Sequence, residues 1–246
     1  MSIAAASTVV YTFDPTTSGG VAGTITTLVG AASTSITADL DLTKANFTAL
    51  NAFDGNCTNV TEYTWHIHTK WANAGKASEF LTGCSLAKTA NHYDPDFACG
   101  PNSDFNNDPK CANKTYGCNA TAYAANPGVC EKGDLSGKLG RMKATSGKIS
   151  ATWTDNGNYP TIAEHMASWN IMLHAVCGAA TPRFVCANAR VYNSTNNTSP
   201  SPTITAPSTT SASPTTSQVK PTPSSATSVK VSVLAMASVA LLAALF

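Results

Sequence analysis

The histidines are the residues of this chain whose type and spacing point most directly to chemistry. His66 and His68 stand in the motif WHIH at residues 65–68. If this segment is a strand, alternate residues face the same side, so the two imidazoles lie side by side and Ile67 faces away. Copper, zinc, iron and nickel all accept imidazole ligands. The pair therefore indicates a metal site, although two histidines alone are equally compatible with ordinary exposed or buried side chains.

Three further histidines bear on that hypothesis. His174 ends the apolar run IMLH at residues 171–174, which we expect to be a second strand, and His92 lies in NHYDP at residues 91–95, where a long loop begins. A β-sandwich can bring two strands and a loop together around one ion. His165 is flanked by a predicted turn, and we expect it on the surface, away from such a site.

Short β-rich segments dominate the chain as far as residue 192, and helix signals are poor. The predicted strands are residues 8–13, 22–28, 35–42, 62–69, 147–154, 168–174 and 183–192, with Gly19 and Gly20 marking a hairpin between the first two. Such strands predict an all-β antiparallel sandwich or barrel. Residues 91–140 are rich in Asn, Pro, Gly and Cys and show no period. So long a loop is usually functional, and we expect disulfides to hold it.

The cysteines and the charge indicate the compartment. The chain has 246 residues, a formal net charge of +1 and 12% charged residues, which gives no basic footprint for nucleic acid or an anionic membrane surface. Its eight cysteines are scattered rather than grouped as CxxC pairs, which favours disulfides and an extracellular location. Sequons for N-linked glycans begin at Asn46, Asn56, Asn59, Asn113, Asn119, Asn193, Asn196 and Asn197.

The C-terminal part of the chain, residues 193–246, divides into two non-globular segments. Residues 193–228 are almost all Ser, Thr, Pro, Ala and Asn and read as an O-glycosylated stalk, which leaves residues 1–192 as the folded domain. Residues 229–246 end in VSVLAMASVALLAALF, which is apolar but short for a membrane span, so we expect a GPI-attachment signal. A tail-anchored membrane protein is the alternative. The start, MSIAAASTVVYTF, does not read as a secretory signal, so we expect a leader ahead of it.

A family resemblance is carried by motifs spread over the whole predicted domain. They are WHIH at 65–68, HYDP at 92–95, GDLSGKLG at 133–140, IMLH at 171–174 and PRFVCANA at 182–189. In this order they resemble the copper/zinc superoxide dismutase superfamily, most closely its copper-only, GPI-anchored cell-surface branch of fungal type. The resemblance implies a Greek-key antiparallel β-sandwich or barrel of about eight strands. It also implies an enzyme that converts superoxide to dioxygen and hydrogen peroxide.

The resemblance also implies roles for individual residues. The copper ligands would be His66, His68, His92 and His174. Arg183 would attract superoxide to the copper, and Cys84 and Cys186 would form the family disulfide. Asp134 matches an aspartate that binds zinc in bimetallic members. Cys57 and Cys177 flank the expected histidine strands and are a further candidate pair, whereas the pairing of Cys99, Cys111, Cys118 and Cys130 stays open.

Two departures from the bimetallic pattern are informative. That pattern has two more zinc-binding histidines between His92 and Asp134, and this chain has none there. Glu131 stands at the expected position of one of them, so we expect no zinc and predict that Glu131 orients His92 and assists proton delivery. The segment 175–182, which would hold a charged loop, is short and uncharged, which implies a more open copper site.

Two other functional classes fit part of the pattern. A non-catalytic copper-binding protein of the cell wall needs the same histidines but has no use for Arg183. A structural wall glycoprotein suits the stalk and anchor signal but gives no reason for the histidine pattern. Arg183 and Glu131 therefore favour the enzyme.

Overall fold

Antiparallel strands form most of the domain in the computed structural model, which describes residues 7–193. The strands are β1 (Ser7–Phe13), β2 (Ala22–Val29), β3 (Thr34–Asp41), β4 (Glu62–His68), β5 (Ser78–Phe80), β6 (Met142–Lys143), β7 (Lys148–Asp155), β8 (Asn170–Ala175) and β9 (Arg183–Asn193). Each strand predicted from the sequence is present, within two residues at either end. The two strands that the sequence pattern did not predict, β5 and β6, are only three and two residues long.

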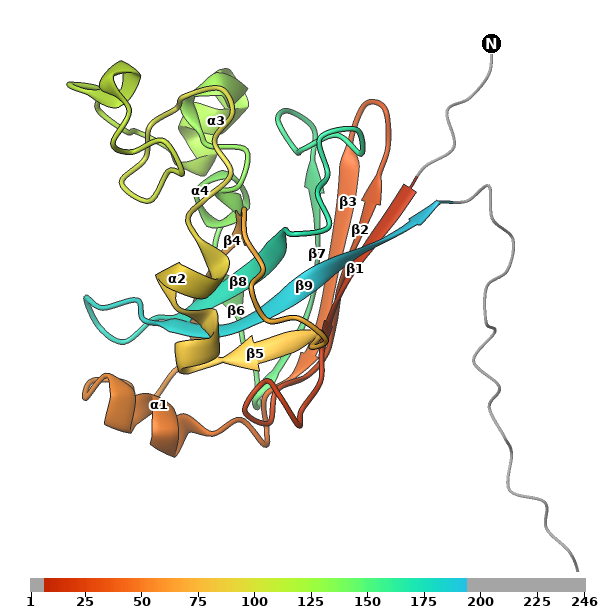
Figure 1. Ribbon diagram of the computed structural model, residues 1–246, viewed down its shortest axis with the longest axis vertical. Coiled ribbons are helices and arrows are strands. Elements are labelled where there is room, and N and C mark those ends of the chain that lie inside the picture. The colour runs from red at the N-terminus through yellow and green to blue at the C-terminus, as the bar shows by residue number, and fades with distance from the viewer. Residues whose placement is uncertain (1–6, 194–246) are drawn as a thin grey trace, which may run out of the picture. The chain divides into compact units, whose positions relative to one another are not determined.

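The strands pair in the order β6-β4-β8-β9-β1-β2-β3-β7, with β5 beside β9. The order departs from the chain order because β9 lies between β8 and β1, and because the chain crosses from β3 to β4. Figure 1 shows β1, β2, β3 and β7 together on one side, β4 and β8 on the other, and β9 crossing between them. This Greek-key, nearly closed barrel confirms the predicted fold class.

Alternating side chains fill the barrel. Along β3, Ile36, Ala38 and Leu40 are buried and the residues between them are partly or fully exposed. On β4, Trp65 and Ile67 belong to the same core. Burying side chains of this kind contributes roughly 1.5–3 kcal/mol each. Because Trp65 and Ile67 point inward, the alternation of the strand turns the histidines between and beside them out of the barrel.

Residues 91–140 form a largely irregular loop over that outer side. The helices of the described domain are short: α1 (Phe47–Phe53), η1 (Leu81–Cys84), α2 (Leu86–Thr89), η2 (Pro109–Cys111), α3 (Ala120–Ala125), η3 (Pro127–Val129) and α4 (Leu135–Leu139). Asn119 caps α3 by accepting from the Ala122 N–H, and Asp134 caps α4 by accepting from the Gly137 N–H. Such short helices depend on caps and packing, which explains why no helical period marks them.

A buried ion pair fastens this loop to the barrel. Lys138 Nζ of α4 lies 2.9 Å from Asp155 Oδ2 at the end of β7, and both side chains are fully buried. Lys138 also donates to the carbonyls of Lys132 and Asn158, and the Tyr123 hydroxyl donates to Asp155 Oδ1. Buried charges need such partners, so this contact fixes α3 and α4 against β7.

Disulfides provide the remaining cross-links, joining Cys57 to Cys177, Cys84 to Cys186, Cys99 to Cys111 and Cys118 to Cys130. The first two tie distant parts of the barrel, at sequence separations of 120 and 102 residues. The other two close small rings within the long loop, each at a separation of 12 residues.

The predicted stalk at residues 193–228, apart from the backbone of Asn193, and the predicted anchor signal at residues 229–246 lie outside the described residues. Among residues 7–193, no helix is long and apolar enough to cross a membrane.

Candidate metal centre

Neighbouring strands present three of the histidines. His66 and His68 lie on the outer face of β4, and β8 pairs with β4 in antiparallel register. His174 stands opposite Thr64, on the same face of β8 as Met172, which stands opposite His66. Since β4 and β8 are adjacent strands inside the sheet, their pairing fixes the Cα positions from which these three imidazoles extend.

A ring of three backbone hydrogen bonds brings the fourth histidine to them. Ile67 N–H donates to the Gly133 carbonyl (2.9 Å), Gly133 N–H donates to Tyr93 (2.8 Å), and Tyr93 N–H donates back to Ile67 (3.0 Å). A Cβ at Gly133 would lie 2.6 Å from the Ile67 oxygen and 2.7 Å from the Tyr93 nitrogen, so only glycine fits here. The ring places His92, beside Tyr93, over the histidines of β4.

The four imidazoles converge on one point. His66, His68, His92 and His174 each offer a ring nitrogen, and these atoms lie within 4.8 Å of one another. The nitrogens concerned are His66 Nδ1 and the Nε2 atoms of His68, His92 and His174, all buried and without a hydrogen-bond partner. Buried polar atoms left unpaired in this way are costly unless something binds them. The donor set therefore fits a metal ion that accepts imidazole, such as copper.

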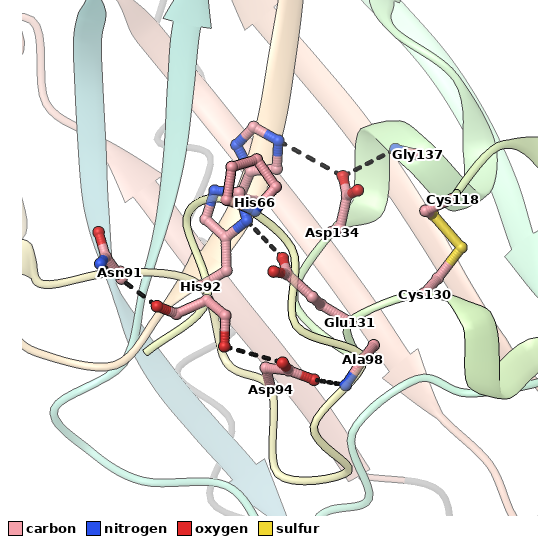
Figure 2. Close-up of polar contacts among 12 residues, drawn as sticks. His66, Asn91, His92, Asp94, Ala98, Cys118, Cys130, Glu131, Asp134 and Gly137 are labelled. Atoms are coloured by element: carbon pink, nitrogen blue, oxygen red, sulfur yellow. Dashed lines mark hydrogen bonds and ion pairs between the residues drawn. A yellow bond between two sulfur atoms is a disulfide. The ribbon is translucent and has the colours of Figure 1, made fainter. Parts of the chain in front are cut away.

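The other nitrogen of each ring has a partner. His68 Nδ1 bonds the Ala90 carbonyl at 2.8 Å, and His174 Nδ1 bonds the Thr181 carbonyl at 2.9 Å. His92 Nδ1 lies 2.6 Å from Glu131 Oε2, and His66 Nε2 lies 3.5 Å from Asp134 Oδ1 (Figure 2). Such contacts fix the tautomer and the ring orientation of a metal-binding histidine.

The pKa shifts keep the imidazoles neutral at pH 7. Burial, reinforced by the neighbouring His92, lowers the pKa of His66 to about 4, and burial likewise lowers the pKa of His92 to about 4. Burial, together with the other imidazoles and Arg183, lowers the pKa values of His68 and His174 well below the ordinary value. Neutral rings keep the lone pairs that a metal ion requires.

The two carboxylates beside the rings differ in charge. Burial, with the nearby charges of Asp134 and Asp94, raises the pKa of Glu131 to about 8. Burial also acts to raise the pKa of Asp134, but contact with His66 and hydrogen bonds from Gly137 and Tyr116 outweigh it and hold that pKa below its usual range. Asp134 is thus ionised at neutral pH, whereas Glu131 gains or loses its proton at a pH close to neutral.

Arg183, at the start of β9, lies beside His68. Its Nη1 donates to Thr89 Oγ1 at 2.7 Å and to the Cys84 carbonyl at 3.3 Å, and it lies 3.5 Å from His68 Nδ1. Cys84 is itself tied to β9 by its disulfide with Cys186. Burial lowers the pKa of Arg183 to about 10, so the guanidinium stays charged at neutral pH.

One carbonyl serves both a histidine and the arginine. The Ala90 oxygen, which is bonded to His68 Nδ1, also accepts from Arg183 Nη2 at 2.9 Å. Ala90 adopts φ 57°, ψ −149°, a conformation that an L-residue holds only at a cost of roughly 1–3 kcal/mol. Sequence reasoning did not find Thr89 or Ala90, because neither stands in a motif and an alanine carries no polar side chain to mark it.

The fifth histidine lies apart from the cluster. His165 is half-buried rather than fully exposed, and its ring stacks on Trp169 with the ring centroids 4.9 Å apart. In the described domain, the group of side chains able to hold a metal ion is thus the set of four without His165.

Comparison with known proteins gives structural neighbours only. No family model and no curated protein match the chain. Among solved structures, superoxide dismutase 5 of Candida albicans in its Cu(II) form is 20% identical, with a TM-score of 0.45 over 77% of this chain and 94% of that one. Cu/Zn superoxide dismutase from Brucella abortus is 16% identical, with a TM-score of 0.36 over 74% and 97%. The clock protein EA4 is 14% identical, with a TM-score of 0.39 over 77% and 96%.

Proposed function

We propose that the protein is a superoxide dismutase that works at a single copper ion held by His66, His68, His92 and His174. The observation that carries the proposal is the convergence of four buried, unpartnered imidazole nitrogens beside a fixed guanidinium. Copper, when bound, supplies the one-electron steps by which two superoxide ions and two protons become dioxygen and hydrogen peroxide. The side chains around it bind the anion, hold the rings and handle protons.

Arg183 supplies the charge that binds the anion. Its contacts with Thr89 and with the Ala90 and Cys84 carbonyls hold the guanidinium beside His68. A fixed positive charge at the rim attracts a small anion and lowers the entropy lost when the anion docks. A protein that only stores copper has no need of this arrangement, and that difference favours the enzyme over the copper-binding wall protein.

Glu131 holds the outer nitrogen of His92. Its carboxyl oxygen lies 2.6 Å from His92 Nδ1 and is almost fully buried. Since burial raises the pKa of Glu131 to about 8, the carboxyl exchanges a proton near neutral pH. We assign to it both the orientation of His92 and the delivery of protons toward the site.

Zinc has no part in this proposal. A closed zinc site takes four protein ligands, and no histidine lies between His92 and Asp134 in the sequence. The outer nitrogen of His92, which a second ion would need, already bonds Glu131. These two observations support a centre that contains copper alone.

We further assign the protein to the cell surface, as an extracellular glycoprotein with a GPI anchor. The apolar segment 229–246 and the Ser/Thr/Pro-rich segment 193–228 support this location. Five sequon asparagines lie among residues 7–192 and are exposed, as N-linked glycans require: Asn46, Asn56, Asn59, Asn113 and Asn119. Four disulfides fit an oxidising compartment.

Metal content tests the four-histidine centre. We expect the protein, exposed to copper and zinc together, to retain about one copper and no stoichiometric zinc in elemental analysis. His68→Ala should lose the copper, whereas His165→Ala, which changes the histidine outside the cluster, should keep it. Retention of stoichiometric zinc would contradict the copper-only centre, and equal copper in both variants would contradict the ligand assignment.

Arg183→Ala tests the anion site. The rate of superoxide consumption at equal copper loading should fall about 10-fold or more at low ionic strength, because steering by a rim charge is worth at least that much. Arg190→Ala removes an exposed charge from the same strand and should leave the rate nearly unchanged. A rate unaffected by Arg183→Ala would remove this residue from the mechanism.

Glu131→Gln tests the proton role while keeping the shape of the side chain. We expect most copper to remain bound and the rate to fall roughly 10- to 100-fold. The loss should grow as pH rises toward about 8, because solvent protons become scarce while Glu131 of the parent protein still holds a proton to deliver. Glu164→Gln is the control, because Glu164 bonds Lys132 and Tyr93 and touches none of the four histidines. A pH–rate profile matching the parent would show that Glu131 has no such role.

Enzymatic release tests the anchor. Phosphatidylinositol-specific phospholipase C should release the mature protein from intact cells, with 224–226 as the attachment region that we expect. Retention in the membrane after complete cleavage of the anchor lipid would instead indicate a spanning tail.

A further inference from the structure

Tyr116, in the long loop between the two small disulfide rings, touches both carboxyl-bearing residues of the site. Its hydroxyl donates to Asp134 Oδ2 at 2.7 Å and accepts from the Glu131 backbone N–H at 3.3 Å. Asp134 and Glu131 in turn contact His66 and His92. A single hydroxyl is therefore linked, through Asp134 and Glu131, to two of the four imidazoles.

The surroundings of Tyr116 hold it in place. Tyr116 lies two residues before Cys118 and Glu131 one residue after Cys130, and the disulfide between these cysteines sets their Cα atoms 4.8 Å apart (Figure 2). Gly100 leaves room for both side chains, because a Cβ there would lie 2.2 Å from Glu131 Oε1 and 3.1 Å from the Tyr116 ring. The Tyr116 ring thus packs closely against Gly100.

The contact with Asp134 settles how that carboxylate is turned. Asp134 Oδ1 accepts from the Gly137 N–H at 2.8 Å and lies 3.5 Å from His66 Nε2. Its other oxygen has Tyr116 as partner. With both oxygens engaged the carboxylate cannot rotate. Loss of the hydroxyl would leave Oδ2 nearly buried and without this donor, and we expect the carboxylate to reorient and shift Oδ1 relative to His66.

We propose that Tyr116 is a positioning residue for the metal centre, which fixes the orientation of His66 through Asp134 and the backbone that carries Glu131. The proposal rests on the proposed function in one respect, that the four histidines hold copper. It predicts that the Tyr116 hydroxyl influences the copper affinity and the ligand field, although its hydrogen bonds go to Asp134 and Glu131 and not to a histidine ring.

The chain contains a matched control in Tyr123. Its hydroxyl also donates to a buried aspartate, Asp155, and also accepts from a backbone N–H, that of Asn158. Asp155 pairs with Lys138 and contacts none of the four histidines. Removing either hydroxyl therefore costs similar bonds, but only the loss at Tyr116 reaches the metal centre.

The test compares Tyr116→Phe and Tyr123→Phe, each loaded with one Cu(II), with the parent protein. We expect Tyr116→Phe to weaken Cu(II) affinity about 10-fold in competition with a chelator, the low end of what loss of an outer partner costs. It should also change the Cu(II) electron paramagnetic resonance spectrum. Tyr123→Phe should lower the midpoint of thermal unfolding but leave affinity and spectrum at parent values. Parent-like affinity and spectrum in Tyr116→Phe would overturn the proposal.

A double variant tests the route through Asp134. If Tyr116 acts through that carboxylate, Tyr116→Phe should have little further effect on Cu(II) affinity in an Asp134→Asn background. Additive losses would overturn this route. Neither measurement uses superoxide, so a protein that binds copper but does not consume superoxide refutes the proposed function and leaves the test of Tyr116 intact. A parent protein that binds no copper would refute the centre and this proposal together.

Discussion

The backbone ring that joins Ile67, Tyr93 and Gly133 is the interaction on which the rest of the site depends. Its three hydrogen bonds join three parts of the chain to one another: a barrel strand, the start of the long loop and the end of that loop. The strand brings two histidines of the cluster, the start of the loop brings a third, and the end of the loop brings the carboxyl groups that contact them. Since a Cβ at Gly133 would collide with both partners, the arrangement requires glycine at that position.

The loop between these points has little regular structure with which to hold itself. Disulfides hold the loop instead. Each of the two small rings, closed between cysteines 12 residues apart, lowers the entropy of the unfolded state and so stabilises the fold by roughly 3 kcal/mol in the chain-entropy model. The buried pair of Lys138 and Asp155 fastens the same loop to the barrel. The barrel thus supplies a rigid base, and covalent and ionic contacts hold the ligand-bearing loop on it.

The sequence predicted what depends on local pattern. The alternation of polar and apolar residues located the strands. The two-residue spacing of His66 and His68 predicted that both side chains lie on one face of a strand, as they do on β4. His165 was separated from the other histidines by its context alone. What the pattern did not predict are contacts between residues far apart in the chain, such as Tyr116 with Asp134 or Thr89 with Arg183. These depend on how an irregular loop folds back, and no periodicity encodes that. The helices were missed for a related reason, since one or two capped turns are too short to show a period.

The backbone at Ala90 has a consequence for anyone who would move this centre into another protein. Its carbonyl accepts hydrogen bonds from both His68 and Arg183, and the chain at this residue is turned to φ 57°, ψ −149°. Grafting four histidines and an arginine onto a new barrel would reproduce the side chains but not this peptide orientation. A glycine at the equivalent position would make the turn easier to form, but it would also make other turns accessible, since glycine populates both halves of conformational space. The transplant therefore has to carry the loop that enforces the turn, and the smallest portable unit is strands β4, β8 and β9 together with their cross-linked loops.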